Sequence, residues 1–356
     1  MLKNHYHVVG VMSGTSLDGV DLAEVFFEFN NGQWDYRFGH TFTEPYDDRR
    51  DKSWLANLVN LSPAALDEAD HSYSLMLGAV INRFIKANNI KGLDAVCSHG
   101  HTALHQPKKG ITRQIGNQKI IAEVLKQTVV CDFRVQDVAL GGQGAPLVPI
   151  GDRLLFGKYD YCINLGGFAN ISFEQDGQRI AYDLCPVNIV LNELVKPLGL
   201  SYDDRGQLAS QGKLIPDLLA QLNALSFYAQ KPPKSLGLEW VKRNIDPLFK
   251  GQHHKTEDLL ATLVEHMAMQ IAAPLKSDAQ LLFTGGGAYN DYLLQRIEAH
   301  KSLKIKVPER ELIEYKEALI FALLGVLKLR GEINCLSSVT GASKDHSSGV
   351  IFNLNI

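Results

Sequence analysis

The chain has 356 residues, of which 45% are hydrophobic and 21% are charged, and its net charge at pH 7 is −3. This length favours two domains, and this composition is typical of a soluble globular protein. The weak net charge provides no global field for nucleic acid or an anionic membrane, and no run of ~18 apolar residues is present to cross a bilayer. We therefore expect neither a nucleic-acid partner nor a membrane segment.

The first half of the chain alternates in a way that predicts three strands followed by helices. The expected strands of this opening meander are 5–12, 20–29 and 35–43. Helical spacing then predicts helices at 51–61 and 62–88, the second with Ser62 as its cap and Pro63 just inside it. A short strand at 94–98, a helix at 119–126 and a buried strand at 128–133 complete the first half. This order predicts an α/β domain with a mixed sheet.

The loop between the first two strands carries small and hydrogen-bonding residues. Gly14 and Gly19 allow consecutive N–H groups to point into one concavity, which would cradle a phosphate. Asp18 and Asp21 would repel a bare anion, so a cation or a substrate hydroxyl is expected between them. The candidate residues are Gly14, Thr15, Ser16, Leu17, Asp18, Gly19, Val20 and Asp21. An ordinary hairpin turn is the alternative.

The second half repeats the pattern of the first after the glycine-rich stretch 141–146. Strands are expected at both ends of 161–173, around the tip Gly166-Gly167, and again at 179–184. The later elements are helices at 187–195, 213–225 and 256–277, a strand at 280–284 and a helix at 313–330. Two similar domains that each present a glycine hairpin would clamp a phosphate chain from two sides.

A third glycine turn, Gly285-Gly286-Gly287, follows a strand and precedes a helix at 291–299. A ligand could approach the backbone there at the positive end of the helix. The pattern G-x-G-x-x-G is only half met because Asn290 takes the place of its third glycine, and no glycine tract ends in Lys-Ser/Thr. A nucleotide site of a less common kind is therefore predicted, with a tight strand-to-helix connection as the alternative.

The stretch Gly10-Val11-Met12-Ser13-Gly14-Thr15-Ser16-Leu17-Asp18-Gly19-Val20-Asp21 resembles the signature of the 1,6-anhydro-N-acetylmuramic acid kinases. Further blocks resemble that family in its order along the whole chain: 98–102, 131–134, 141–149, 164–172 and 317–322. The resemblance implies the actin, Hsp70 and hexokinase-like fold, an α/β architecture of two ribonuclease-H-like domains around a central ATP and sugar cleft. We expect the first domain at 1–138 plus 336–356 and the second at 139–335.

The resemblance also implies the chemistry. Water opens the 1,6-anhydro ring of a muramic sugar while O6 receives the γ-phosphate of ATP, with Mg²⁺ as the usual partner of ATP, in a cytoplasmic homodimer. The block 14–21 corresponds to the ATP-binding loop, to which Gly166, Gly167 and Gly285 to Gly287 add backbone. Asp183 corresponds to the catalytic base, and a helix cap is its alternative role.

One departure follows Asp183. The family has Thr-Gly-Pro-Gly-Asn there, whereas this chain has Leu184-Cys185-Pro186-Val187-Asn188. A valine cannot replace a glycine at positive φ, so this backbone is expected to be regular or differently routed. We expect Cys185 to be a packing residue, since no basic partner is adjacent in sequence.

Three residues are candidates for binding the sugar. Arg134 could bind the lactyl carboxylate, with an interdomain salt bridge as the alternative, and Asn188 is retained from the family's block. Glu317 could orient sugar or water, with a helix-dipole carboxylate as the preferred alternative.

The cysteines and histidines do not have the spacing of a metal-binding motif. The five cysteines are an odd number, scattered and without a C-x-x-C pair, which indicates reduced thiols in a cytoplasm. The chain starts with polar residues and shows no apolar core of a signal peptide, so a cytoplasmic location is expected. The cluster of Cys97, His99, His101 and His105 favours loop hydrogen bonding over a metal site, and no metal held by protein side chains is predicted.

Two other classes of function remain open. A dinucleotide-dependent oxidoreductase would use 285–290 with Glu309 or Glu311 on a ribose, but it leaves the duplicated hairpins unexplained. An actin-like ATP-binding protein, either non-catalytic or acting on another sugar or partner, would use ATP to drive a domain closure. Thermal stabilisation by ATP and magnesium but not by NAD would remove the oxidoreductase, and sugar-dependent release of ADP would remove the non-catalytic protein.

Overall fold

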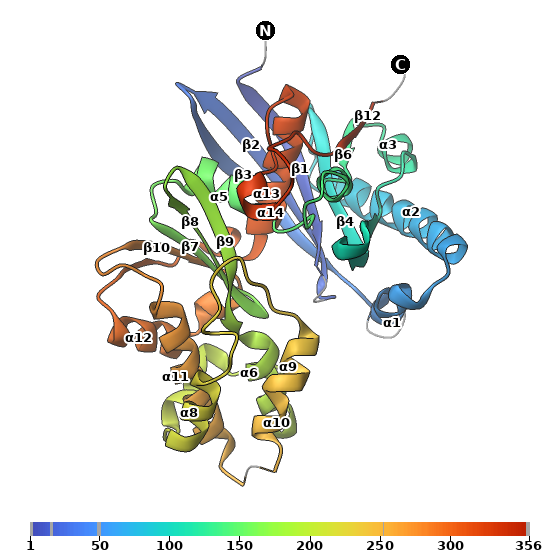
Figure 1. The fold of residues 1–356 in the computed structure, drawn as a ribbon. Helices are drawn as coiled ribbons and strands as arrows, with labels where there is room; N and C mark the ends of the chain where they lie inside the picture. The colour runs from blue at the N-terminus through green and yellow to red at the C-terminus, as the bar shows by residue number, and fades with distance from the viewer. Residues whose placement is uncertain (1–2, 15–16, 48–50, 252, 354–356) are drawn as a thin grey trace. The chain divides into compact units, whose positions relative to one another are not determined.

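The computed structural model describes residues 3–14, 17–47, 51–251 and 253–353. The chain divides into two compact units, and Figure 1 shows the sheet and helices of each. Unit 1 comprises residues 1–155 and 315–356, and unit 2 comprises residues 156–314. The second division falls inside the long helix α13 (Arg310–Arg330), where Tyr315 leaves helical geometry with φ −111° and ψ 15°.

Unit 1 is built on a seven-stranded mixed sheet. Its strands are β1 (His5–Ser13), β2 (Gly19–Asn30), β3 (Gln33–Pro45), β4 (Ala95–Gln106), β5 (Ile111–Ile115), β6 (Val129–Cys131) and β12 (Val350–Phe352). The order is β12-β6-β4-β1-β2-β3, with β5 on β4. The strands β1, β4 and β6 are parallel, and β2 is antiparallel to both of its neighbours. The C-terminal strand β12 pairs with β6 and so belongs to this sheet.

Helices cover both faces of this sheet. Those of unit 1 are α1 (Asp51–Asn57), α2 (Pro63–Ala87), α3 (Ile120–Leu125), α4 (Val135–Ala139), α5 (Val148–Phe156), α13 from residue 315 and α14 (Ser337–Thr340). Tyr73 and Leu77 of α2 share a core with Val9 and Val11 of β1. On the other face, a Cβ on Gly10 would lie 2.0 Å from the Ala318 carbonyl oxygen, so α13 packs against bare backbone of β1.

Unit 2 has a five-stranded sheet in the order β11-β10-β7-β8-β9. Its strands are β7 (Tyr161–Leu165), β8 (Phe168–Gln175), β9 (Gln178–Pro186), β10 (Gln280–Thr284) and β11 (Lys304–Lys306). Its helices are α6 (Asn188–Val195), α7 (Gln207–Gln211), α8 (Pro216–Asn223), α9 (Leu238–Asn244), α10 (Asp246–Phe249), α11 (Thr256–Ala272), α12 (Asp291–His300) and the start of α13. Ile163 of β7 packs in one core with Leu260 of α11 and Ile297 of α12.

The two sheets share one strand order. When β7, β8, β9, β10 and β11 are matched to β1, β2, β3, β4 and β6, the second sheet has the order of the first sheet without β12 and β5. In both sheets the meander is antiparallel and the strands added beside its first member are parallel to it. The predicted α/β fold with a duplicated meander and two mixed sheets is therefore confirmed.

The structure differs from the expectations at several places. The residues 98–102 lie inside the long strand β4 rather than in a turn after it, because β5 pairs with its second half. The segments 139–155 and 315–335 were expected in the second domain, but they belong to unit 1, where the buried Lys316 of α13 forms a 2.7 Å ion pair with Asp152 of α5. In the part of the chain that the structure describes, no helix is both long and apolar enough to span a membrane.

Candidate functional site

The loop after β1 lies at the carboxyl end of the parallel strands of unit 1, the edge where α/β sheets commonly bind ligands. Thr15 and Ser16 lie outside the described residues. Leu17 takes a left-handed conformation, with φ +60°, and its N–H donates to the Gly14 carbonyl at 3.3 Å. Such a φ is uncommon for leucine, so the loop turns sharply at this point.

Gly19 and Val20 begin β2, and the pairing of this strand with β3 accounts for the glycine. A Cβ at Gly19 would lie 2.4 Å from the Glu44 carbonyl oxygen. Asp21, further along β2, accepts a 2.6 Å hydrogen bond from the Thr43 hydroxyl, whereas Asp18 is exposed at the strand's edge. Of the two carboxylates, Asp18 is therefore the more accessible to a ligand.

A buried network of side chains supports this loop. The Ser13 hydroxyl hydrogen-bonds to the Tyr46 hydroxyl at 2.7 Å and to Nδ1 of His101 at 2.9 Å. Tyr46 in turn hydrogen-bonds to Tyr73 at 2.6 Å. Burial lowers the pKa of His101 to about 4, so its imidazole is neutral at pH 7. The network fixes the end of β1 where the loop begins.

Arg134 follows β6 at the same edge, and its guanidinium is held on two sides. Its Nε donates to Nε2 of His99 at 2.8 Å, and its Nη1 donates to the Gly144 carbonyl at 2.6 Å. Because His99 accepts through Nε2, its Nδ1 carries the proton and donates to the Gly100 carbonyl at 2.9 Å. Burial lowers the pKa of Arg134 to about 10, which leaves it a cation at pH 7.

Glu317 lies on α13 of unit 1 and interacts electrostatically with Arg134. Its side chain reaches solvent, but loss of hydration raises the pKa of the carboxyl, and the attraction of Arg134 and Lys316 only partly offsets this. Glu317 comes two residues after the irregular Tyr315, so it is not in the first turn of α13. Arg134 and Glu317 thus attract each other electrostatically within unit 1.

Asp183 lies near the end of β9 in unit 2 and is partly buried. Its Oδ2 accepts a 2.7 Å hydrogen bond from the Leu236 N–H, and its own N–H donates to the Lys234 carbonyl at 3.1 Å. Burial raises the pKa of its carboxyl, and the Leu236 hydrogen bond partly reverses the shift. Among the described residues, no hydrogen bond is made to Oδ1, which is left available to water.

The altered residues after Asp183 form a bulge. Asn170 of β8 pairs with Asp183, whereas its neighbour Ala169 pairs with Cys185, so Leu184 is the extra residue. Val187 has φ −127° and ψ −101°, an irregular conformation that needs no glycine. Cys185 is fully buried and burial raises the pKa of its thiol, which confirms it as a packing residue.

Two glycines of unit 2 are required by the protein's own packing. Gly285 has φ +79°, and a Cβ there would lie 2.7 Å from Oδ1 of Asn164. A Cβ at Gly287 would lie 2.8 Å from the Leu165 side chain. The turn after β10 is therefore packed directly against the end of β7.

At three other positions, the described part of the chain does not require a glycine. Gly166, Gly167 and Gly286 all lack a positive φ. The nearest atom to an added Cβ would be at 3.3 Å, 3.7 Å and 3.9 Å, respectively, distances that need at most a small shift. Bare backbone at these positions leaves room for a ligand.

Asn188 lies between the two glycine turns. Its N–H donates to the Gly166 carbonyl at 3.3 Å, and its side-chain amide donates to the Leu165 carbonyl at 3.4 Å. A Cβ at Gly287 would lie 3.5 Å from Nδ2 of Asn188. This side chain therefore braces the glycine turns.

In the structure, each histidine of the sequence cluster has a different hydrogen-bond partner. The structure also shows that Leu236, which the sequence analysis did not identify, contributes to the site. His99 binds Arg134, His101 binds Ser13, and His105 binds Thr112 at 3.1 Å, so the three imidazoles serve different partners. Leu236 positions Asp183 through its backbone N–H. A backbone donor more than fifty residues away carries no signal in a single sequence.

Comparison with known proteins gives one family over nearly the whole chain. The family described as "Anhydro-N-acetylmuramic acid kinase" matches residues 6–354. A relative of that name from Mannheimia succiniciproducens is 36% identical over 99% of this chain and 100% of its own length. Another, from Aliivibrio fischeri, is 34% identical over 98% of this chain and 99% of its own length.

A solved structure, component A of the (R)-2-hydroxyglutaryl-CoA dehydratase of Acidaminococcus fermentans, aligns with a TM-score of 0.44 at 13% identity. The alignment covers 91% of this chain and 99% of that chain.

Proposed function

The chain belongs to the anhydro-N-acetylmuramic acid kinase family, and from that membership we propose which of its residues carry out the reaction. The activity is that of a sugar kinase of cell-wall recycling: anhydro-N-acetylmuramic acid is phosphorylated on O6 as water opens its 1,6-anhydro ring. The family match favours this function over an oxidoreductase or a non-catalytic ATP-binding protein. The single observation that carries the assignment of residues is the position of Asp183.

Asp183 is proposed to act as the base. Oδ2 is oriented by the Leu236 N–H, which leaves Oδ1 to accept a proton from the water that attacks C1. Burial raises the pKa of this partly buried carboxyl, which makes it a stronger base than an exposed aspartate. The bond from C1 to O6 breaks as the water bonds to C1, and O6 takes the γ-phosphoryl group of ATP while ADP leaves.

The glycine turns fit a bound ATP. Gly166, Gly167 and Gly286 keep free the space that side chains would fill, so backbone N–H groups can approach phosphate oxygens there. Gly285 and Gly287 are proposed to hold the shape of this cradle, and Asn188 to brace it. In unit 1, the loop 14–21 is proposed to contact the phosphates. Its exposed Asp18 carries a carboxylate, the kind of group that binds Mg²⁺. ATP supplies the phosphoryl group, and Mg²⁺ supplies charge neutralisation.

Arg134 is proposed to bind the lactyl carboxylate of the sugar. Nε and Nη1 are already engaged by His99 and Gly144, so a carboxylate would meet Nη2 and the second hydrogen of Nη1. Glu317 is proposed to act on the same side of unit 1 by accepting a hydrogen bond from sugar or water.

A homodimeric assembly and a cytoplasmic location are also proposed. The family resemblance implies a homodimer, which sedimentation equilibrium would test. The five cysteines are buried and form no disulfide, which suits a reducing compartment such as the cytoplasm.

The test uses Asp183→Asn in water enriched in the heavy oxygen isotope. We expect the wild-type product to carry the label on the anomeric carbon and none on phosphate, since O6 comes from the sugar itself. The variant should fold and bind ATP but lose roughly 10²–10⁴ in turnover, with ring opening and phosphorylation lost together. Label on inorganic phosphate would indicate plain ATP hydrolysis, and a fully active variant would place the base elsewhere.

A further inference from the structure

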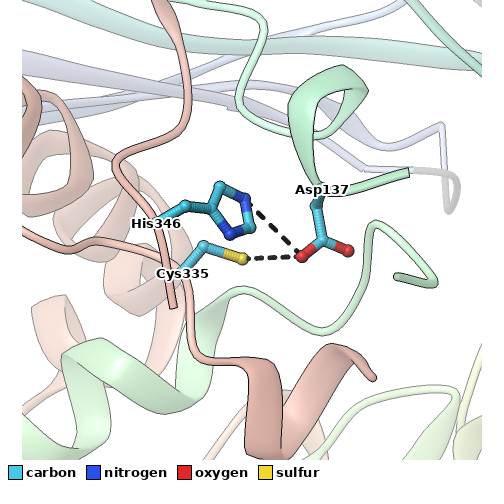
Figure 2. Close-up of side chains that lie close together, drawn as sticks. All are labelled: Asp137, Cys335 and His346. Atoms are coloured by element: carbon cyan, nitrogen blue, oxygen red, sulfur yellow. Dashed lines mark hydrogen bonds and ion pairs between the residues drawn. The ribbon is translucent and has the colours of Figure 1, made fainter. Parts of the chain in front are cut away.

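Three potential metal ligands from distant parts of the sequence meet inside unit 1. Asp137 comes from α4, Cys335 follows α13, and His346 follows α14. They are 0%, 1% and 5% exposed, respectively. One ligand atom from each lies within 4.8 Å of the others, and Figure 2 shows the imidazole and the sulfur directed at the same carboxylate. Among the described residues, no other group of three meets this description.

The Asp137 carboxylate organises the surrounding chain. Its Oδ2 accepts a 2.7 Å hydrogen bond from the Gly144 N–H. Its Oδ1 accepts from Sγ of Cys335 at 3.1 Å and from the Thr340 hydroxyl at 2.7 Å. The side chain therefore links the glycine-rich loop to the C-terminal segment.

One ring nitrogen of the buried His346 takes no part in these hydrogen bonds. Its Nδ1 lies 3.1 Å from the Lys344 carbonyl, and a carbonyl only accepts, so Nδ1 carries the proton. In a neutral imidazole, Nε2 is then an acceptor. It has no hydrogen-bond partner among the described residues and lies 3.7 Å from Oδ1 of Asp137. Two buried acceptors therefore face each other, an arrangement that a cation between them would stabilise.

We propose that Asp137, Cys335 and His346 bind one Zn²⁺ ion. A carboxylate, a thiolate and an imidazole are the three kinds of protein ligand that zinc uses. On binding, the ion displaces the thiol proton of Cys335 to solvent, so the two negative ligands balance the charge of the metal. A buried site of this kind is neutral, which avoids the cost of burying an unpaired charge.

The observed distances are close to those that zinc requires. With usual bond lengths, a tetrahedral ion would hold sulfur and carboxylate oxygen about 3.6 Å apart, and nitrogen and oxygen about 3.4 Å apart. The corresponding distances are 3.1 Å and 3.7 Å, each within about 0.5 Å of the tetrahedral value, and the ligand atoms of all three residues lie within 4.8 Å of one another. The Thr340 hydroxyl, which donates to the same carboxylate oxygen at 2.7 Å, holds the Asp137 ligand in place.

The proposed ion is structural and lies apart from the reacting atoms. The three ligands are buried too deeply for a substrate to reach. The ion would join the C-terminal segment to Gly144, whose carbonyl accepts from Arg134, and so would hold the loop that positions this arginine. The charged groups that act on the cluster include Arg134, on Asp137 and Cys335, and Asp345, on Cys335 and His346.

The experiment measures metal binding to the untagged full-length protein. Zn²⁺ is titrated in competition with a chromophoric chelator, and Co²⁺ is added separately as a spectroscopic probe of the ligands. We expect one Zn²⁺ per chain, and with Co²⁺ we expect thiolate charge-transfer bands and the visible bands of a tetrahedral site. Cys335→Ala and His346→Gln should each bind Zn²⁺ at least ~100-fold more weakly, because even outer-shell changes cost 10–100-fold.

Cys162→Ala is the matched control, since it removes another buried cysteine, from β7 of unit 2. It should keep the wild-type stoichiometry and spectrum. The exposed neighbours His253 and His254 can bind metal weakly at the surface, but they give no thiolate band. A wild-type protein that binds no stoichiometric Zn²⁺, a Co²⁺ complex without thiolate bands, or a Cys335→Ala variant with unchanged affinity would overturn the proposal and leave a protonated His346 paired with Asp137.

Discussion

The loop after β1 in unit 1 and the glycine turns of unit 2 occupy equivalent edges of two sheets with the same strand order, but they are built differently. In unit 1, Gly19 is needed for strand pairing, and the edge is held by buried side chains such as Ser13 and His101. In unit 2, Gly286 has open space where a side chain would lie. Duplicated topology therefore does not imply a duplicated way of binding: one edge offers braced side chains, and the other offers bare backbone.

The largest effect on stability is expected at Gly19. In Gly19→Val the new side chain would meet the Glu44 carbonyl of β3, which is backbone and cannot move aside. Overpacking of this kind should lower the free energy of unfolding by roughly 3 kcal/mol. Chemical denaturation measures it. If stability is unchanged while ATP affinity falls, Gly19 serves the ligand as Gly286 does, and the contrast between the two edges fails.

A smaller effect, on binding and not on stability, is expected at Gly286. Gly286→Val should weaken ATP binding by about 10–100-fold, which corresponds to roughly 1.4–2.7 kcal/mol, because the side chain fills the space kept for phosphate. The free energy of unfolding should change by less than about 0.5 kcal/mol. Isothermal titration with a non-hydrolysed ATP analogue and a denaturant titration give the two numbers.

Gly285→Ala in the same turn is the control for that variant. Its positive φ and the contact with Asn164 predict a clear loss of stability. Equal behaviour of the Gly285 and Gly286 variants would show that packing, and not a ligand, explains both glycines.

An effect confined to acidic pH is expected in the stability of the protein, through His101. Its pKa is lowered from 6.5 to about 4 in the folded protein, so below pH 6.5 the unfolded chain takes up a proton that the folded chain refuses. The contribution of His101 to the free energy of unfolding is complete above pH 6.5. About 1–3 kcal/mol of it is lost as the pH falls towards 4.

His101→Gln should flatten the stability profile between pH 6.5 and pH 4, as measured by denaturant titrations at several pH values. The exposed His71→Gln, on α2, serves as the control and should retain the wild-type profile. An unaltered profile in His101→Gln would mean that acid sensitivity does not originate in the side-chain network of unit 1.

Much of the fold could be predicted because its signals are local. Alternating apolar residues give β1, β2 and β3 nearly to the residue, and Ser62 caps α2 with its hydroxyl 3.3 Å from the Ala65 N–H, as its position before Pro63 suggests. The strand at 280–284 is also confirmed, as β10. These elements follow from side-chain period and cap chemistry, which are written in neighbouring residues.

Some functional residues could likewise be predicted from local sequence, and others could not. The sequence by itself determined the family, the glycine turns and the candidate base, because these are motifs of contiguous residues. Only the tertiary structure decided which glycines are needed for packing, since that depends on which atoms face each Cβ across the sheet. It alone also brought Cys335 to Asp137, 198 residues away, because such a contact follows from the return of the chain to the first sheet and from no local pattern.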